Sequence, residues 1–112
     1  MNYTVDELKT IVAEAVAAGQ AAGAAAYQAN GNTDWDACGF AWVSLWGIKG
    51  NTRLGKALRS AGIDQNYDRS FQIWGGRFYS GQSITIKEQA CRAARDVFKR
   101  YGFDATVGSR LD

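Results

Sequence analysis

The stretch Phe40-Ala41-Trp42-Val43-Ser44-Leu45-Trp46 has the alternation of a β-strand, with apolar side chains on both of its faces. Successive side chains of a strand point to opposite sides, so the aliphatic residues share one face and the aromatic residues share the other. The first face holds Ala41, Val43 and Leu45, and the second holds Phe40, Trp42 and Trp46. The aliphatic face suits a compact core. The aromatic face must either be covered by another element or be used for binding.

The chain around this strand has 112 residues, which predicts one domain over residues 1–112. We expect an N-terminal helical part over residues 1–30 and an α+β core over residues 38–112. Histidine is absent, and two cysteines are too few for a zinc site, so we expect no metal, no cofactor and no enzymatic activity. No signal peptide is recognisable, which predicts a cytoplasmic protein whose cysteines are free and buried.

Charge is distributed unevenly along the chain. Residues 1–36 carry one lysine against five acids, a net charge of −4, whereas residues 37–112 carry twelve basic residues against six acids, a net charge of +6. The second part is therefore basic enough to attract phosphates or an acidic partner, although solvated helix faces would give the same composition. The uncharged run over residues 15–33 contains no Leu, Ile or Phe, so we expect no contact with a membrane.

The N-terminal segment predicts a long helix over residues 4–29. Thr4-Val5-Asp6-Glu7 is a capping box, and an apolar stripe follows it at helical spacing. The stripe narrows toward its end to small residues, namely Gly19, Ala22, Gly23 and Ala26. Small side chains allow a close approach by another surface. An aromatic sheet face of the same chain would fit there, and so would a second copy of the helix in a homodimer.

The order of elements after residue 38 is predicted as β-α-β-β-α-β. Strands are expected near residues 39–46, 69–74, 77–79 and 105–107, with a tight hairpin at Gly75-Gly76. Helices are expected after Asn51 or Thr52 and after a second capping box, Thr85-Ile86-Lys87-Glu88. This order is typical of a ferredoxin-like sheet with two helices on one face. The alternative is a three-stranded α+β sheet in which residues 77–83 form a loop.

Two interpretations of the aromatic face follow. In the favoured one, helix 4–29 folds back over it, because large exposed aromatic patches are rare in monomers. In the other, part of the face is open and binds single-stranded nucleic acid or a small ligand by stacking, as in RNA-recognition domains, although the glycine-aromatic signature of those domains is absent. The candidate binding residues are Phe40, Trp42, Trp46, Trp74, Arg77 and Tyr79.

A second candidate site lies at the start of the helix that follows the aromatic strand. Gly50-Asn51-Thr52-Arg53-Leu54-Gly55-Lys56-Ala57 has the spacing of a phosphate-binding loop, but Ala57 stands where magnesium binding requires Ser or Thr. We therefore do not expect a nucleotidase. The exposed amides of a helix start can still hold a phosphate or carboxylate, and the candidate residues for this anion site are Lys49, Asn51 and Arg53.

Three segments carry a resemblance to known proteins: residues 38–43, residues 50–56 and the ending Gly108-Ser109-Arg110-Leu111-Asp112. Over residues 33–112 the chain resembles small uncharacterised proteins encoded by tailed bacteriophages. The resemblance implies a viral origin and a setting inside an infected bacterium, but it brings no activity or site with it. We therefore expect a non-enzymatic accessory protein that binds a macromolecule, with a host or phage protein favoured over nucleic acid.

Overall fold

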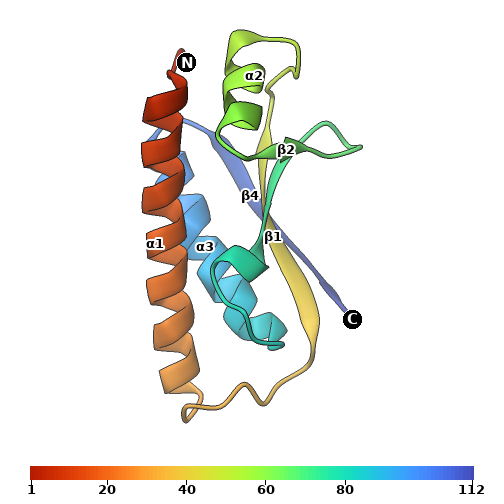
Figure 1. Ribbon diagram of the computed structural model, residues 1–112. Helices are drawn as coiled ribbons and strands as arrows, with labels where there is room; N and C mark the ends of the chain where they lie inside the picture. The colour runs from red at the N-terminus through yellow and green to blue at the C-terminus, as the bar shows by residue number, and fades with distance from the viewer.

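The computed structural model describes every residue from Met1 to Asp112 and confirms the α+β class. Three helices and a four-stranded antiparallel sheet make up the fold (Figure 1). In chain order the elements are α1 (Val5–Ala29), β1 (Gly39–Trp46), α2 (Arg53–Ser60), β2 (Asp64–Gln65), β3 (Phe71–Trp74), the 3-10 turn η1 (Gly75–Arg77), α3 (Ile84–Arg100) and β4 (Asp104–Leu111).

The predicted alternation of β1 is present in the structure. β1 lies inside the sheet, whose order is β2-β3-β1-β4, and it pairs with β3 on one side and with β4 over its whole length on the other. Ala41, Val43 and Leu45 are buried on the inner face, whereas Phe40 and Trp46 are exposed on the outer face. Neighbouring strands continue the pattern, because Phe71 and Ile73 of β3 and Ala105 of β4 are also buried.

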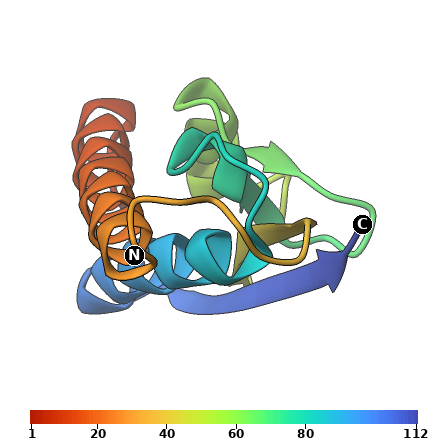
Figure 2. The same ribbon diagram turned by 90° about the horizontal axis from the view of Figure 1, so that it is seen from below.

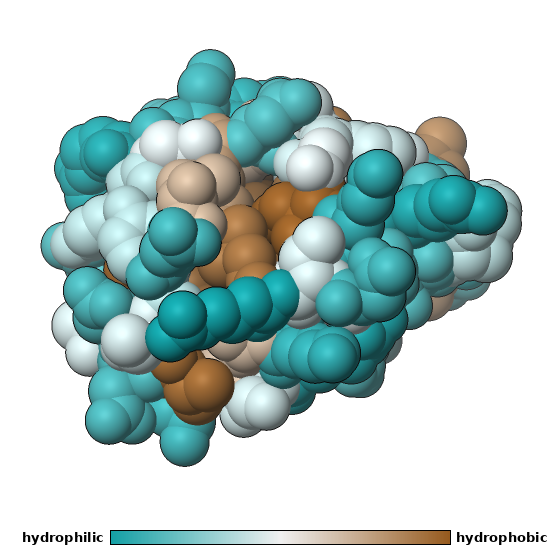
Figure 3. Space-filling view, turned by 90° about the horizontal axis from the view of Figure 1, so that it is seen from above, coloured by the Kyte–Doolittle hydropathy of each residue, from teal (hydrophilic) through white to brown (hydrophobic).

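All three helices share one core with the inner face of the sheet. Leu8 of α1, Leu58 of α2 and Ala94 of α3 belong to the same buried cluster as Val43 and Phe71. Viewed along α1, that helix stands beside α3, and α3 lies over β4 (Figure 2). The end of the molecule near the N-terminus is largely hydrophilic, with hydrophobic atoms visible at its centre (Figure 3).

Helix α1 does not cover the aromatic face, contrary to our favoured interpretation. Its predicted capping box is present, with Thr4 and Glu7 exchanging hydrogen bonds between side chain and backbone. The helix runs antiparallel to α3 and packs against it, so it lies on the same side of the sheet as the other helices (Figure 1). The Tyr3 hydroxyl donates a 2.7 Å hydrogen bond to the Tyr101 carbonyl, which joins the segment before α1 to the C-terminal end of α3.

The small residues of α1 are filled by side chains of the same chain. The Phe78 ring lies so close to Gly19 that a Cβ there would be 2.8 Å from ring atoms, and Phe78 itself is buried. Gly23 faces Tyr79 and Ala90 at ordinary contact distances. The stripe is therefore occupied within the monomer and does not offer the surface that we had assigned to a homodimer through the N-terminal helix.

The hairpin predicted at Gly75-Gly76 is wrong. The chain instead forms η1, in which Gly75 passes so close to the Ala41 carbonyl oxygen that a Cβ would be 2.8 Å from it. This turn directs Phe78 into the core, and the predicted strand 77–79 does not exist. β3 instead forms a hairpin with β2, the strand that precedes it in the chain. Residues 66–70 make the turn of this hairpin, in which the Asn66 amide donates to the Ser70 carbonyl at 2.8 Å.

The ferredoxin-like arrangement is consequently not confirmed in the form that we predicted. The strand order is β2-β3-β1-β4, and β3 rather than residues 77–79 pairs with β1. The three-stranded alternative is correct in leaving residues 77–83 outside the sheet, but it misses β2. Other boundaries also shift: Ser83 caps α3 in place of the expected box at Thr85, and β4 continues to Leu111.

The two cysteines are both free, but only one is buried. Cys91 on α3 is fully enclosed, and burial raises the pKa of its thiol to about 12. Cys38 is exposed just before β1, where we had expected a buried thiol. None of the three helices combines the length and the apolar composition needed to cross a membrane.

The contact between Gly19 and Phe78 generates a prediction. Gly19→Ala should destabilise the protein by about 1–3 kcal/mol, because the added methyl overlaps a buried ring. Gly23→Ala is the matched control: its Cβ would be 3.4 Å from the nearest atom, so the gain in helix propensity, up to about 1 kcal/mol, should be retained. Chemical denaturation measures both, and equal stabilisation by the two variants would contradict the packing described.

Candidate binding face and basic cleft

Three aromatic side chains form a cluster on the outer face of the sheet. Trp42 of β1 lies directly opposite Trp74 of β3 in the strand register, and their ring centroids are 5.3 Å apart. Phe40 meets the Trp74 ring edge-on, with centroids 6.3 Å apart and planes at 88°. Trp74 is 47% exposed and Phe40 is 36% exposed, so the cluster presents ring surface to solvent. We call Phe40, Trp42 and Trp74 the aromatic cluster.

Two cations border the aromatic cluster at Phe40. The Lys87 ammonium and the Arg110 guanidinium lie 5.5 Å and 5.4 Å from the centroid of the Phe40 ring, within the range of cation–π attraction. Lys87 also donates a 3.0 Å hydrogen bond to the Gly39 carbonyl, which fixes its position at the start of β1. Positive charge is therefore held beside exposed aromatic surface at this end of the strand.

Gly108 makes room for the central indole of the aromatic cluster. It lies opposite Trp42 in the register of β1 and β4, and a Cβ there would be 2.5 Å from Cε2 and Nε1 of Trp42. The indole therefore lies flat across the neighbouring strand at a position where only glycine has space for it. This close approach explains why Trp42 is only partly exposed while the ring of Trp74 stands further out.

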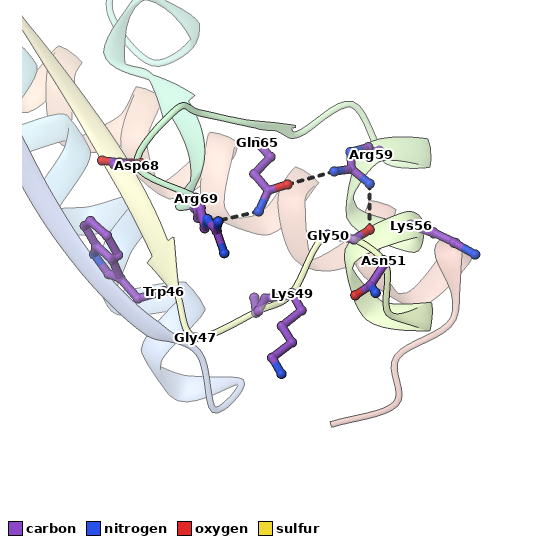
Figure 4. Close-up of a pocket in the computed structure, with 11 residues that line it drawn as sticks. Trp46, Gly47, Lys49, Gly50, Asn51, Lys56, Arg59, Gln65, Asp68 and Arg69 are labelled. Carbon is purple, nitrogen blue, oxygen red and sulfur yellow. Dashed lines mark hydrogen bonds between the residues drawn. The ribbon is translucent and has the colours of Figure 1, made fainter.

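Trp46 connects the outer face to a cleft at the other end of β1. Its Nε1 donates a 2.8 Å hydrogen bond to the Thr106 hydroxyl, and the side chain is 37% exposed. The cleft has a volume of about 840 Å³ and extends from Trp46 toward α2 (Figure 4). Its lining consists of Trp46, Gly47, Ile48, Lys49, Gly50, Asn51, Lys56, Arg59, Gln65, Asp68 and Arg69. We call it the basic cleft.

Four cations and one carboxylate line the basic cleft, so its local charge is positive. Arg59 is held within the wall: it donates to the Gly50 carbonyl at 2.6 Å and to the Gln65 side chain at 2.8 Å (Figure 4). Lys49, Lys56 and Arg69 form no ion pair, since the one salt bridge of the structure joins Arg95 and Asp96 on α3. Three cationic side chains of the cleft are therefore free to meet an anion.

The carboxylate of the cleft is committed to its own loop. Asp68 accepts hydrogen bonds from the hydroxyl of Ser70 at 2.6 Å and from its amide at 2.9 Å, and the pKa of Asp68 is lowered by these bonds, the hydroxyl contributing most. It is accordingly ionised at neutral pH and is positioned for structure. The same loop places Arg69 in the left-handed region, with φ at +70°, where its carbonyl accepts a bond from Gln65.

Some of the binding residues predicted from the sequence lie in the aromatic cluster or the basic cleft, and others lie elsewhere in the structure. Lys49 and Asn51 line the basic cleft, but Arg53 does not, because it points into a different groove beside Tyr3 and Val5. Arg77 lies on η1, where its carbonyl accepts a 3.4 Å hydrogen bond from the Gln20 side-chain amide of α1. Arg77 and Tyr79 belong to the segment that we had wrongly predicted to be a strand, which is why neither joins the aromatic cluster.

Tyr79 and the linker acids hold the linker between α1 and β1. The Tyr79 hydroxyl donates to Asp34, which also accepts from the amides of Gln82 and Ser83. The pKa of Asp34 is lowered, mainly by the hydrogen bond from Tyr79. The pKa of Tyr79 is raised to about 12, mainly by burial and next by its hydrogen bond to Asp34. Asp36 accepts from the Ser83 hydroxyl. No three acidic or cysteine side chains lie close enough to hold a metal ion.

The chain matches no protein-family model, and no curated protein or solved structure matches it. Its function therefore has to be argued from the geometry of the aromatic cluster and the basic cleft.

Gly108 generates a prediction about the aromatic cluster. Gly108→Ala should displace the Trp42 indole from the surface of β4, because the added methyl occupies the position of the ring. Near-UV circular dichroism should change, and quenching of tryptophan fluorescence by a soluble quencher should increase. Gly76→Ala is the control, since nothing lies within 4 Å of its added Cβ. Identical spectra for the wild type and Gly108→Ala would contradict the close approach of the indole.

Proposed function

We propose that the protein binds single-stranded nucleic acid, with bases on the aromatic cluster and phosphates in the basic cleft. One observation carries the proposal: no element of the chain covers the outer face of the sheet, and Trp46 joins that face to the cleft. Aromatic rings on a sheet beside a cationic groove are the combination that single-strand binders use. The proposal treats nucleic acid, our alternative partner, as the better fit.

The stacking half of the proposal rests on the exposed rings. Trp74 presents the most surface of the aromatic cluster, and base stacking on such a ring contributes about 1–3 kcal/mol. The spacing from Phe40 to Trp46 along β1 is about 20 Å at the rise of a β-strand. A short run of nucleotides, rather than one base, would be needed to reach from the Phe40 end to the cleft.

The electrostatic half rests on the unpaired cations. Lys49, Lys56 and Arg69 of the cleft, together with Arg110 and Lys87 at the other end of the face, have no carboxylate partner within ion-pair distance. A phosphate backbone crossing the face would meet positive charge at both ends of β1. Each neutralised phosphate releases counterions, so affinity should fall as salt rises.

Binding, rather than catalysis, is supported by the directions of the pKa shifts. The carboxylate pKa values that are shifted are lowered, as at Asp34 and Asp68. The phenol and thiol pKa values that are shifted are raised, as at Tyr79 and Cys91. A general acid or base that works near neutral pH needs the opposite directions. These shifts instead suit groups that hold the fold together.

The resemblance of residues 33–112 to proteins of tailed bacteriophages adds a setting to the proposal. In that setting the protein is an accessory factor that acts on nucleic acid inside an infected cell. A host or phage protein docked on the same face is the competing occupant. It would also contact the aromatic cluster, but it would not require the cations at both ends of β1.

The aromatic cluster is tested with Trp74→Ala. Affinity for a short single-stranded oligonucleotide, measured by fluorescence anisotropy, should fall by about 5- to 150-fold, which corresponds to the loss of one stacked base. Trp35→Ala is the control, because Trp35 is 87% exposed in the linker and lies outside the cluster. Absence of oligonucleotide binding by the wild type would remove nucleic acid as the partner and favour a protein on this face.

The basic cleft is tested through the salt dependence of the same binding. Lys49→Ala should reduce the slope of log affinity against log salt concentration by about 0.7, the value for one phosphate contact on a single strand. Lys99→Ala, on the exposed side of α3, should leave the slope unchanged. Equal slopes for all three proteins would mean that phosphates do not enter the cleft.

A further inference from the structure

One long strand of the sheet is an edge strand, with a hydrogen-bonded neighbour on one side only. The two edges are β2, with two residues, and β4, with eight. β4 lies at the margin of the molecule, and no other part of the chain pairs with it beyond β1 (Figure 2). An edge of this length is a template for pairing with another strand. It carries neither proline nor a bulge that would block pairing.

The backbone groups available along this edge can be identified from the register. The Asp112 amide donates to the Cys38 carbonyl, and Cys38 and Asp112 continue the pairing of β1 with β4. Hydrogen bonds of a strand alternate between its two sides, so even-numbered residues of β4 bond to β1. The amides and carbonyls that point outward belong to Ala105, Val107, Ser109 and Leu111.

We propose that β4 pairs antiparallel with β4 of a second copy of this chain, with Val107 opposite Val107 of that copy. The outward-pointing groups restrict a symmetric pairing to registers in which odd-numbered residues oppose odd-numbered residues. Among these, the register centred on Val107 places Asp104 opposite Arg110 of the second copy, and Arg110 opposite its Asp104. Two opposite charges thus face each other twice across the interface.

Charge complementarity selects the second copy as the occupant. Asp104 and Arg110 both lie on the outer face of the sheet, and both are exposed. In this register they form non-hydrogen-bonded pairs, in which side chains of opposed residues come closest. Neither residue has an ion-pair partner in the monomer. Opposite charges directly across two strands stabilise the pairing, and like charges oppose it.

The proposed dimer has a defined geometry. A two-fold axis perpendicular to the sheet passes between the two Val107 residues. The two four-stranded sheets therefore join into one sheet of eight strands. The outer faces of both copies lie on the same side, and their aromatic clusters are related across the β4 strands. The dimer does not depend on nucleic-acid binding. It would place the two aromatic clusters on one face, and it would pair Arg110, which leaves Lys87 as the free cation near Phe40.

Charge reversal tests the register. Sedimentation equilibrium of the wild-type protein should show a monomer–dimer equilibrium. Asp104→Arg and Arg110→Asp should each raise the dissociation constant by about tenfold or more, because each places like charges opposite one another twice. An equal mixture of the two variants should recover wild-type affinity, since every pair between unlike chains is again attractive.

Ser109→Pro tests the hydrogen bonds along the edge. Its amide points away from β1, so proline should block dimerisation while leaving the pairing within the chain intact. In the wild type, the Val107 and Ser109 amides should exchange with solvent more slowly as protein concentration rises. A wild-type protein that remains monomeric at all concentrations, or a dimer that is insensitive to the charge reversals, would overturn the proposal.

Discussion

The packing of α1 against α3 determines which surfaces of the protein are available. Phe78 fills the space beside Gly19, and the apolar stripe of α1 is buried in the same core as the inner face of the sheet. A helix of 25 residues that could have covered the aromatic face is thereby held on the opposite side of the sheet. The outer rings are exposed because the core contacts of α1, including the one between Gly19 and Phe78, all lie on the helix side of the sheet.

The outer face combines ring surface with charge that the chain leaves unpaired. β1 and β3 carry the rings, and cations lie at both ends of β1: Lys87 of α3 and Arg110 of β4 near Phe40, and Lys49 and Arg69 of two loops near Trp46. Cations near solvent cost little to leave unpaired, whereas bound phosphates would gain from each of them. The arrangement favours an extended anionic ligand over a compact apolar one.

The sequence was most informative where local pattern and burial coincide. The alternation in residues 40–46, the capping box at Thr4 and the cap at Thr52 depend on neighbouring residues, and all are found in the structure. The position of α1 could not be predicted, because small residues fit a phenyl ring, a sheet or another helix equally well. Gly75-Gly76 was misread for a similar reason, since the close approach to Ala41 depends on a strand more than thirty residues earlier.

In the candidate sites, too, residues that depend on local pattern were predicted, and residues that depend on contacts distant in the sequence were missed. Phe40, Trp42 and Trp46 follow from parity on one strand, and Trp74 joins them through the register of β3 with β1. Arg59 of α2, Gln65 of β2 and Arg69 of the β2–β3 turn were missed as cleft residues, because they line the same cleft as Lys49 only once β2 has paired with β3. The only signal for that turn is the polar run Asn66-Tyr67-Asp68.

The exposed position of Cys38 gives the chain an unusual asymmetry between its sulfur atoms. Cys91 is enclosed and protonated, since its thiol has a pKa of about 12, so thiol-alkylating reagents meet one accessible thiol sulfur in the native state. That atom belongs to the residue immediately before Gly39 and Phe40, at the margin of the aromatic cluster. A dye attached there would sit next to whatever the face holds, and the second thiol would become reactive only when α3 separates from the sheet.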